Sequence, residues 1–336
     1  MLTIAVDAMG GDLGPRVAFR ACKALLRSQP DVRILLPLEP DQQALAKKIL
    51  AKFSDRIEII GCSGHIRMSD SPKSALKQAG TSTMGVALSL HADGRADGVL
   101  SIGNTGALLM LAMKYIGTFS GIDRPALATQ LPTRNKPVLM MDLGANIGMS
   151  PEDLLQLGRL ASAWCMIGGE PHPTIGLLNI GTEPGKGPEV VRRAGELFST
   201  ELASGYRGFI EGDHLFDGRL DAVVCDGYSG NIALKTTEGL IEWLLSMMGN
   251  ELRQSLALRW FIPMWKATMR RIDRQVSPAR HGGAMLLGIA GHVAKTHGKS
   301  DERTFRYALE YLVRQIRTRD FRSLESAFSE YNTPVS

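Results

Sequence analysis

The sequence predicts an α/β protein built on a mainly parallel, doubly wound, Rossmann-like sheet. Short apolar runs rich in β-branched residues recur along the chain, and helical patterns separate them. Strands that are covered by helices on both faces have this continuous apolar character. The runs lie at residues 3–6, 32–36, 56–60, 97–102, 136–143, 174–180 and 220–225. Because no linker rich in Pro, Gly or Ser divides them, we expect one α/β domain over residues 1–336.

The helices between these runs have recognisable beginnings. Ser71 precedes Pro72, and Ser150 precedes Pro151, so each pair offers an N-cap side chain and a proline at the first helical position. Residues 301–317 repeat apolar side chains at helical spacing, which predicts an amphipathic helix that closes the fold.

Residues 238–274 depart from this alternation. The segment is helical by composition, is divided near Pro263, and holds three of the four tryptophans, namely Trp243, Trp260 and Trp265. We therefore expect a helical excursion that protrudes from the sheet.

Composition and charge exclude several classes of protein. With 336 residues, 44% hydrophobic, the chain is long enough to bury a large core. The four cysteines are far apart and form no C-x-x-C pair, so we expect neither a zinc site nor disulfides, but a reducing cytosol. Residues 1–14 lack a basic segment and carry Asp7 within the first apolar stretch, so we expect no signal peptide. No apolar run reaches the length of a membrane span.

Five of the apolar runs are followed by loops rich in Gly, Asp and Asn. These loops are residues 7–12, 103–106, 142–146, 181–187 and 226–231. In an open parallel sheet the carboxyl ends of the strands meet at one edge, so we expect the five loops to form one site there. Glycine loops and helix N-termini favour an anion. The alternative is that these residues only make turns and helix caps.

The candidate groups in these loops suit an anionic ligand. Lys186 is the only basic residue in the five loops, while Asn104, Asn146 and Asn231 are neutral donors. The loop at 181–187 resembles a P-loop but lacks its spacing and the Ser or Thr after Lys186, and no G-x-G-x-x-G follows the first run. The loop carboxylates leave a cation site as a minor alternative.

Three further residues have two readings each. His281 and His297 lie in loop-like contexts where an imidazole can do acid–base chemistry, although histidines often only cover surface. Cys225 ends an apolar run and is more typical of a buried thiol than of a nucleophile.

The loops together resemble the phosphate acyltransferase (PlsX) family. The resemblance rests on motifs that keep their order and spacing across nearly the whole chain. They are Asp7–Asp12, Ser101–Ala107, Gly121–Ala126, Asp142–Asn146, Gly181–Glu183 with Lys186-Gly187, Asp226–Asn231, Gly282–Gly288 and His297–Asp301.

The resemblance implies an enzyme that makes acyl-phosphate from acyl-[acyl-carrier protein] and inorganic phosphate, for phospholipid biosynthesis. It implies a homodimer with a sheet similar to isopropylmalate dehydrogenases and phosphotransacetylases, and neither a cofactor nor a metal. It assigns catalysis to Lys186 and Asn231, with Asp226 ordering the site. The implied phosphate- or substrate-binding residues are Gly10, Gly11, Asn104, Thr105, Gly106, Asn146, Gly187, Gly230 and His297.

Two stretches depart from the family pattern. After Asn146 the family commonly has an apolar residue and then Asp, whereas this chain has Gly148 in that place. Residues 67–83 also differ, which weakens the transfer of family roles to that segment.

Residues 250–274 combine aromatic and basic side chains in a pattern typical of a helix on an anionic membrane surface. The contact residues we expect are Arg253, Arg259, Trp260, Phe261, Trp265, Lys266, Arg270 and Arg271. Much of the net charge of +5 lies here, so the rest of the chain is nearly neutral. The family implies a cytoplasmic, peripherally membrane-associated protein that serves a membrane glycerol-3-phosphate acyltransferase. The alternatives are a dimer interface or docking of the acidic carrier protein.

Two other functions compete with this interpretation. One is an NAD-dependent decarboxylating dehydrogenase on a similar sheet, and the other is a non-catalytic scaffold for lipid-synthesis enzymes. Nucleic acid is the weakest candidate partner, because aromatic residues make up only 6% of the chain and do not interleave with a basic surface.

Overall fold

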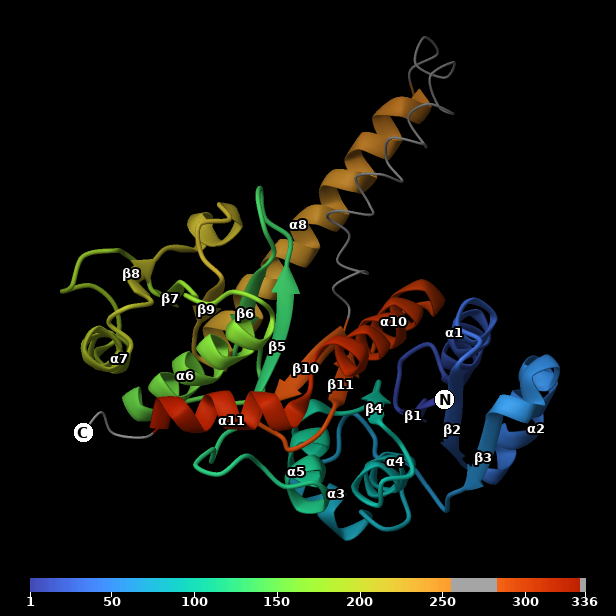
Figure 1. The fold of residues 1–336 in the computed structure, drawn as a ribbon. Helices are drawn as coiled ribbons and strands as arrows, with labels where there is room; N and C mark the ends of the chain where they lie inside the picture. Colours follow the sequence, from blue (N-terminus) through green and yellow to red (C-terminus); the bar gives the residue numbers. More distant parts are fainter. Residues whose placement is uncertain (255–282, 333–336) are drawn as a thin grey trace.

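The computed structural model describes residues 1–254 and 283–332, which form an α/β fold around one large sheet (Figure 1). The described part of the sheet has eleven strands in the order β3-β2-β1-β4-β11-β10-β5-β6-β9-β7-β8. The strands are β1 Leu2–Asp7, β2 Val32–Leu38, β3 Ile57–Gly61, β4 Gly98–Ser101, β5 Ala126–Leu131, β6 Val138–Met141, β7 Ile175–Leu178, β8 Tyr206–Ile210, β9 Ala222–Val224, β10 Gly283–Leu287 and β11 Val293–Thr296.

The helices lie between the strands, as the apolar periodicity predicts. They are α1 Pro15–Ser28, α2 Pro40–Leu50, α3 Pro72–Lys77, α4 Thr83–Ala92, α5 Thr105–Tyr115, α6 Pro151–Ile167, α7 Glu189–Glu201, α8 Gly227–Gln254, α10 Glu302–Thr318 and α11 Phe321–Asn332. The predicted caps are confirmed: Ser71 accepts a hydrogen bond from Ser74 N, and Ser150 forms a capping box with Asp153.

Strand direction reverses in the middle of the sheet. β10 is antiparallel to both β11 and β5, and β5 is antiparallel to β6, whereas the other pairs are parallel. The sheet is therefore mainly parallel, as predicted, but its two parallel halves run in opposite directions. The carboxyl ends of β1, β4 and β11 lie at one end, which we call the Asp7 end. Those of β6, β7 and β9 lie at the opposite, Asp142 end.

The expectation that all five loops meet at one edge is therefore wrong. It assumed a uniformly parallel sheet, and the strands that reverse the direction, β5 and β10, were not among the predicted runs. β5 mixes Ala, Thr and Gln with its leucines, and β10 reads Gly-Ala-Met-Leu-Leu, so neither is a continuous β-branched run. The loops at 7–12 and 103–106 lie at the Asp7 end, and the other three lie at the Asp142 end.

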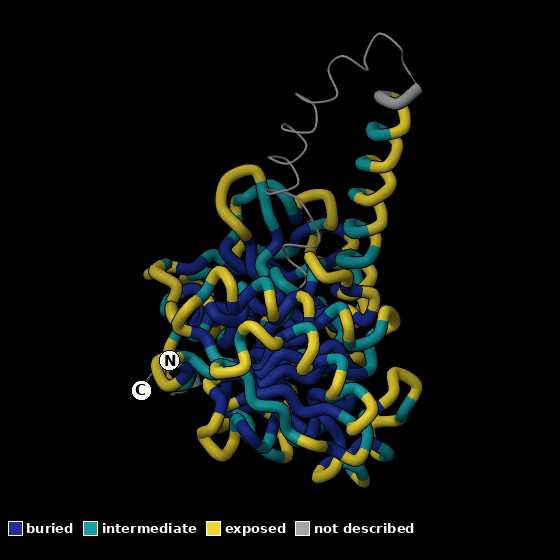
Figure 2. The backbone as a smooth tube through the Cα atoms, turned by 90° about the vertical axis from the view of Figure 1, so that its right-hand side faces the viewer, coloured by how far each residue is buried: buried dark blue, intermediate teal, exposed yellow. Residues whose placement is uncertain are grey.

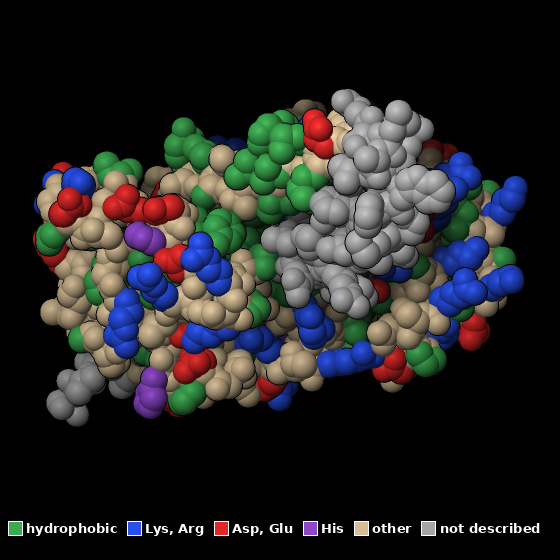
Figure 3. Space-filling model, turned by 90° about the horizontal axis from the view of Figure 1, so that it is seen from above, with side chains coloured by type: hydrophobic (Ala, Val, Ile, Leu, Met, Phe, Trp, Pro, Cys, Tyr) green, Lys and Arg blue, Asp and Glu red, His purple; other side chains and the backbone are tan. Residues whose placement is uncertain are grey.

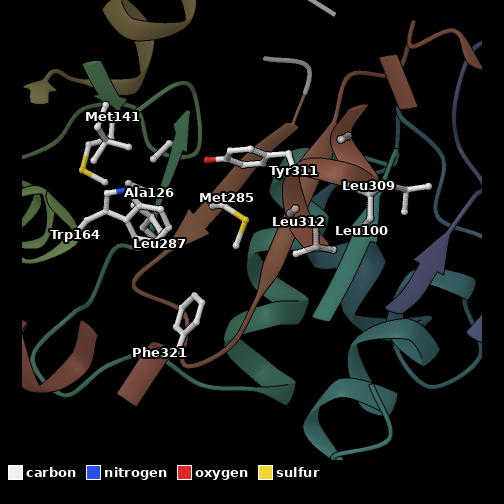
Figure 4. Close-up of a cluster of buried hydrophobic side chains, with 14 of the residues drawn as sticks. Leu100, Ala126, Met141, Trp164, Met285, Leu287, Leu309, Tyr311, Leu312 and Phe321 are labelled. Atoms are coloured by element: carbon white, nitrogen blue, oxygen red, sulfur yellow. The ribbon is translucent and has the colours of Figure 1, made fainter. Parts of the chain in front are cut away.

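Two helical layers bury the sheet on both faces. α1, α6, α7, α10 and α11 cover one face, while α3, α4, α5 and the start of α8 cover the other. Alternate residues of each strand pack into the hydrophobic cores on opposite faces of the sheet, which is why the strands are apolar throughout. The strands lie in the buried interior of the molecule (Figure 2). Around β10, Met285 and Leu287 lie between Trp164 and Leu312 of the outer helices (Figure 4).

Helix α8 begins against the body and then projects beyond it (Figures 1 and 2). Its outer part exposes large apolar side chains, including Leu240, Trp243 and Met247. The predicted division near Pro263 lies outside the described residues. Within the described residues, no helix combines the length and apolar character needed to cross a membrane.

Candidate active site

Asp142 organises the loop after β6. Its carboxylate is fully buried and accepts hydrogen bonds from the backbone N–H groups of Leu127, Ala145 and Asn146, at 3.0, 3.1 and 2.6 Å. Asn146 adds a bond from Nδ2 to the same carboxylate, at 3.0 Å, and another to the carbonyl of Pro125. Burial raises the pKa of Asp142, while these donors lower it. Both side chains thus stabilise the loop, and the Asn146 amide donors are already used.

The first turn of α8 packs directly onto this loop. Asp226 accepts hydrogen bonds from Gly148 N at 3.0 Å and from Tyr228 N at 2.8 Å, so it joins the loop to the helix start. Gly148, where the family commonly has Asp, therefore contributes its backbone N–H here. Gly230 lies so close to the Asp142 carbonyl oxygen that a Cβ would overlap it. The chain needs glycine at 230 for this packing, whatever its part in substrate binding.

Asn231 differs from the other candidate asparagines. It is exposed, it lies beside Gly144, and among the described residues its side-chain amide makes no hydrogen bond. Cys225, two residues before α8 begins, is buried, and burial raises the pKa of its thiol well above the usual range, which fits a structural role. Asn231 therefore presents the free donor at this end of α8.

At the Asp7 end, a second buried carboxylate organises two loops. Asp7 accepts hydrogen bonds from Thr83 Oγ1 at 2.7 Å and from Ser101 Oγ at 2.6 Å. Gly10 has a positive φ of 91°, and the neighbouring Asp12 N donates to the carbonyl of Gly298 at 2.9 Å. The structure thus brings the Gly10-Gly11 loop against the His297 loop, although the two are far apart in sequence.

Asn104 is occupied as a helix cap. Its Oδ1 accepts from Ala107 N at 3.0 Å, and its Nδ2 donates to the carbonyls of Met68 and Asp70. Thr105 and Gly106 form the first turn of α5 that this cap stabilises, and Gly106 lies against Pro72. These bonds tie α5 to the 67–83 segment, where the family resemblance is weakest.

Lys186 lies on the loop after β7, exposed and paired with Glu183 at 2.8 Å. The hydrogen bond to Glu183 raises the pKa of Lys186, so the amine is positively charged at neutral pH. Its neighbour Gly187 has a positive φ of 91° and packs against Asn179. Among the described residues, Lys186 makes no hydrogen bond or ion pair with Asn231 or with the loops at the Asp7 end, so the expected cluster of five loops is not seen.

Helix α8 begins after β9 at the Asp142 end, and its Leu234 lines the same groove as Leu131, which ends β5 at the Asp7 end. That one helix reaches both ends of the sheet was not predicted from the sequence. Lys235 follows Asn231 by one helical turn on the same face, and its charge lowers the pKa values of both Lys295 and His297, after burial. Lys235 pairs with Glu238 at 2.6 Å. The sequence offers two signals for this arrangement. One is Lys295, a lysine within the segment 293–296, and the other is Lys235, which lies four positions after Asn231.

A largely apolar groove of about 720 Å³ lies between α8 and the β5–β6 turn. Its lining residues are Leu131, Pro132, Thr133, Arg134, Asn135, Pro137, Phe216, Leu234, Thr237, Glu238, Leu240, Ile241 and Leu244. Seen from above, hydrophobic side chains gather on this side of the molecule (Figure 3). The volume falls in the range of small-molecule sites, and Glu238 links the groove to Lys235.

No group of three or more His, Cys, Asp or Glu side chains within residues 1–254 and 283–332 is arranged to hold a metal ion. The buried carboxylates Asp7 and Asp142 are instead engaged by the donors described above.

The fold is that of phosphotransacetylase-like α/β proteins. A phosphotransacetylase from Streptococcus pyogenes aligns with a TM-score of 0.59 and 17% identity, covering 98% of this chain and 94% of that one. A putative 4-hydroxythreonine-4-phosphate dehydrogenase from Salmonella typhimurium aligns with a TM-score of 0.50 and 13% identity, over 93% and 98% of the two chains. At these identities the likeness establishes the fold alone.

Sequence similarity then identifies the family. The family model described as "Fatty acid synthesis protein" matches residues 2–321. A phosphate acyltransferase from Cellvibrio japonicus is 38% identical over 95% of both chains, and one from Delftia acidovorans is 41% identical over 92% of this chain and 89% of its own. The chain belongs to this family of phosphate acyltransferases, and it is an acyltransferase rather than a dehydrogenase or a scaffold.

Proposed function

We propose that the protein transfers an acyl group from acyl-[acyl-carrier protein] to inorganic phosphate, for phosphatidic acid synthesis. The observation that carries this proposal is the arrangement along one face of α8. The free amide of Asn231 lies one turn from Lys235, and the apolar groove begins beside Leu234. One helix thus carries, in succession, a donor for a carbonyl, a positive charge for phosphate and an apolar surface for a long acyl chain.

In this mechanism a phosphate oxygen attacks the thioester carbonyl carbon. The new C–O bond forms a tetrahedral oxyanion, which collapses with cleavage of the C–S bond, and the carrier thiolate leaves and takes up a proton. Asn231 donates to the oxyanion, Lys235 supplies positive charge for the phosphate and Lys186 supplies positive charge for the oxyanion. Asp226 holds the first turn of α8 in place. Because phosphate is itself the nucleophile, the proposal assigns no role to a cofactor, a metal or a covalent enzyme intermediate.

The direct test is to incubate the protein with acyl-[acyl-carrier protein] and phosphate and to trap acyl-phosphate with hydroxylamine. We expect phosphate-dependent acyl hydroxamate and release of the free carrier thiol. A parallel reaction with acyl-CoA reports whether the carrier is required. No hydroxamate with any acyl thioester would overturn the proposed function.

The groove makes a prediction about chain length. Leu240→Trp places a larger side chain in the groove, so we expect KM for a long-chain acyl donor to rise about tenfold relative to a short-chain donor. Met247→Trp is the matched control, because Met247 lies on the same helix but does not line the groove. Steady-state kinetics with both donors check this. Equal effects of the two variants would contradict the assignment of the groove to the acyl chain.

We also propose that residues 250–274 bind an anionic membrane surface, which would bring the cytoplasmic homodimer to the membrane glycerol-3-phosphate acyltransferase. Arg253 lies at the end of α8, while Arg259, Trp260, Phe261, Trp265, Lys266, Arg270 and Arg271 lie outside the described residues. We expect the double change Trp260→Ser and Phe261→Ser to abolish co-sedimentation with anionic vesicles without changing the mass of the dimer. Unchanged sedimentation would remove the membrane assignment, and loss of the dimer would assign the segment to subunit contact.

A further inference from the structure

We propose that Lys295, Lys235 and His297 form a binding site for a phosphate group. This inference rests on the proposed function and deepens it, since neither lysine belongs to the loops from which the site was first predicted. Two sources share this chemistry: the inorganic phosphate that attacks the thioester, and the phosphodiester of the carrier protein's prosthetic group.

Lys295 carries the argument because it is a buried amine without an anionic partner. Only 8% of Lys295 is exposed, and its Nζ donates to the carbonyl of Thr296 at 3.0 Å. No carboxylate among the described residues pairs with it. A buried ammonium without a counter-ion is strongly unfavourable in free energy, so a bound anion would stabilise the charged form of this amine. Burial, followed by the charge of Lys235, lowers the pKa of Lys295 to about 8.

The neighbouring strand fixes where this amine lies. Lys295 is one residue before the end of β11 and pairs in register with Ser101 of β4. Ser101 in turn donates to the buried Asp7 carboxylate, and its Oγ accepts a bond from Gly103 N at 3.0 Å. Lys295 therefore lies beside the glycine loops of the Asp7 end, on a rigid strand.

His297 contributes a neutral donor. Its Nδ1 accepts a hydrogen bond from Lys299 N at 3.1 Å, which leaves the proton on Nε2. Partial burial and the charges of Lys235, Lys295 and Lys299 lower the pKa of His297, while Glu238 raises it. The loop is braced by the hydrogen bond between Thr296 and Ser300 at 2.8 Å and by that from Asp12 N to the Gly298 carbonyl.

Lys235 links this cluster to Asn231, the residue that we propose donates to the substrate carbonyl. It is partly exposed, and Glu238 holds it at 2.6 Å. An arriving phosphate offers several acceptor oxygens and competes with this single carboxylate for the ammonium. Residues four apart on a helix are about 5–6 Å from each other at Cβ, so a phosphate held by Lys235 lies next to a carbonyl held by Asn231. Compact lysine charges and a neutral donor suit a tetrahedral phosphate better than a planar carboxylate, which favours the arginine fork.

The test compares Lys295→Met, Lys235→Met and His297→Gln with Lys299→Met. The last variant removes a charge from the same loop without removing a proposed ligand. Phosphate binding is measured as the rise in melting temperature with inorganic phosphate at constant ionic strength, and KM is measured separately for phosphate and for the acyl donor. Lys235→Met and His297→Gln change exposed or partly exposed side chains, so they keep the test valid if Lys295→Met does not fold.

If free phosphate occupies the site, we expect the three variants to lose the phosphate-induced shift and to raise KM for phosphate at least tenfold. If the prosthetic group's phosphodiester occupies it, KM for acyl-[acyl-carrier protein] rises, while KM for an acyl-N-acetylcysteamine thioester, which lacks phosphate, does not. Unchanged shifts and KM values in folded variants, or an equal effect of Lys299→Met, would overturn the site. Phosphate binding by a parent protein that forms no acyl-phosphate would instead refute the proposed function and leave the site standing.

Discussion

Replacing Asn231 with alanine is expected to lower kcat for acyl-phosphate formation by about 10²- to 10³-fold, the effect typical of removing one preorganised oxyanion donor. The Asn231 side chain is exposed and makes no hydrogen bond within the described part of the protein, so its loss should not change stability. Because the interaction would form mainly with the oxyanion, KM should change little. Hydroxylamine trapping gives kcat and KM, and urea unfolding gives the free energy of unfolding.

Asn104→Ala is the matched control. The Asn104 side chain caps α5 and donates to two carbonyls, so its removal is expected to destabilise the protein by about 1 kcal/mol, with a smaller effect on kcat than Asn231→Ala.

The variants Lys186→Ala and Glu183→Gln separate two roles of Lys186, one in catalysis and one in stabilising its loop. If Lys186 acts on the substrate, Lys186→Ala lowers kcat and Glu183→Gln does not; if it only stabilises its loop, both changes act alike. Parent-like turnover by both Asn231→Ala and Lys186→Ala would refute the catalytic assignment.

The sequence predicts the layers of this fold well, because the signals are local. Ser71 and Ser150 cap their helices as expected, and each of the seven predicted apolar runs overlaps a strand, although β5, β8, β10 and β11 were not among those runs. What it does not predict is the reversal of direction at β10 and β5. Direction depends on which strands become neighbours, and β10 pairs with residues more than 150 positions earlier in the chain. No local periodicity carries that information.

The same limit explains the outcome at the candidate site. Composition singled out loops with the right chemical groups, but it does not distinguish a free donor from a saturated one. Asn104 and Asn146 use their amides to hold loops, while the Asn231 amide makes no hydrogen bond to any described residue, although all three follow strands in similar Gly-rich settings. Lys295 was not predicted because residues 293–296, which form β11, are not among the predicted apolar runs. Its burial follows from strands and helices that meet only in the folded chain.

Gly230→Ala is expected to be the most destabilising single-methyl change in α8. The added Cβ would overlap the Asp142 carbonyl oxygen and lie 2.7 Å from Cys225 Sγ. Neither neighbour can move easily, since Asp142 is held by several donors and Cys225 is buried. We expect a loss of about 3 kcal/mol in the free energy of unfolding, measured by urea denaturation followed by circular dichroism.

Gly239→Ala is the control in the same helix, because outside the adjacent helix backbone no atom of the described residues lies within 4 Å of the position where its Cβ would be built. There alanine should stabilise the protein by up to about 1 kcal/mol, as it does in an open helix interior. The two variants add the same methyl group. Changes of opposite sign in the free energy of unfolding would therefore assign the loss at Gly230 to the contact between α8 and the Asp142 loop. This contact also places Asn231 beside Gly144, and Gly230→Ala should therefore lower kcat even where the protein remains folded. A Gly230→Ala protein with parent stability and parent turnover would mean that the contact does not position the Asn231 amide.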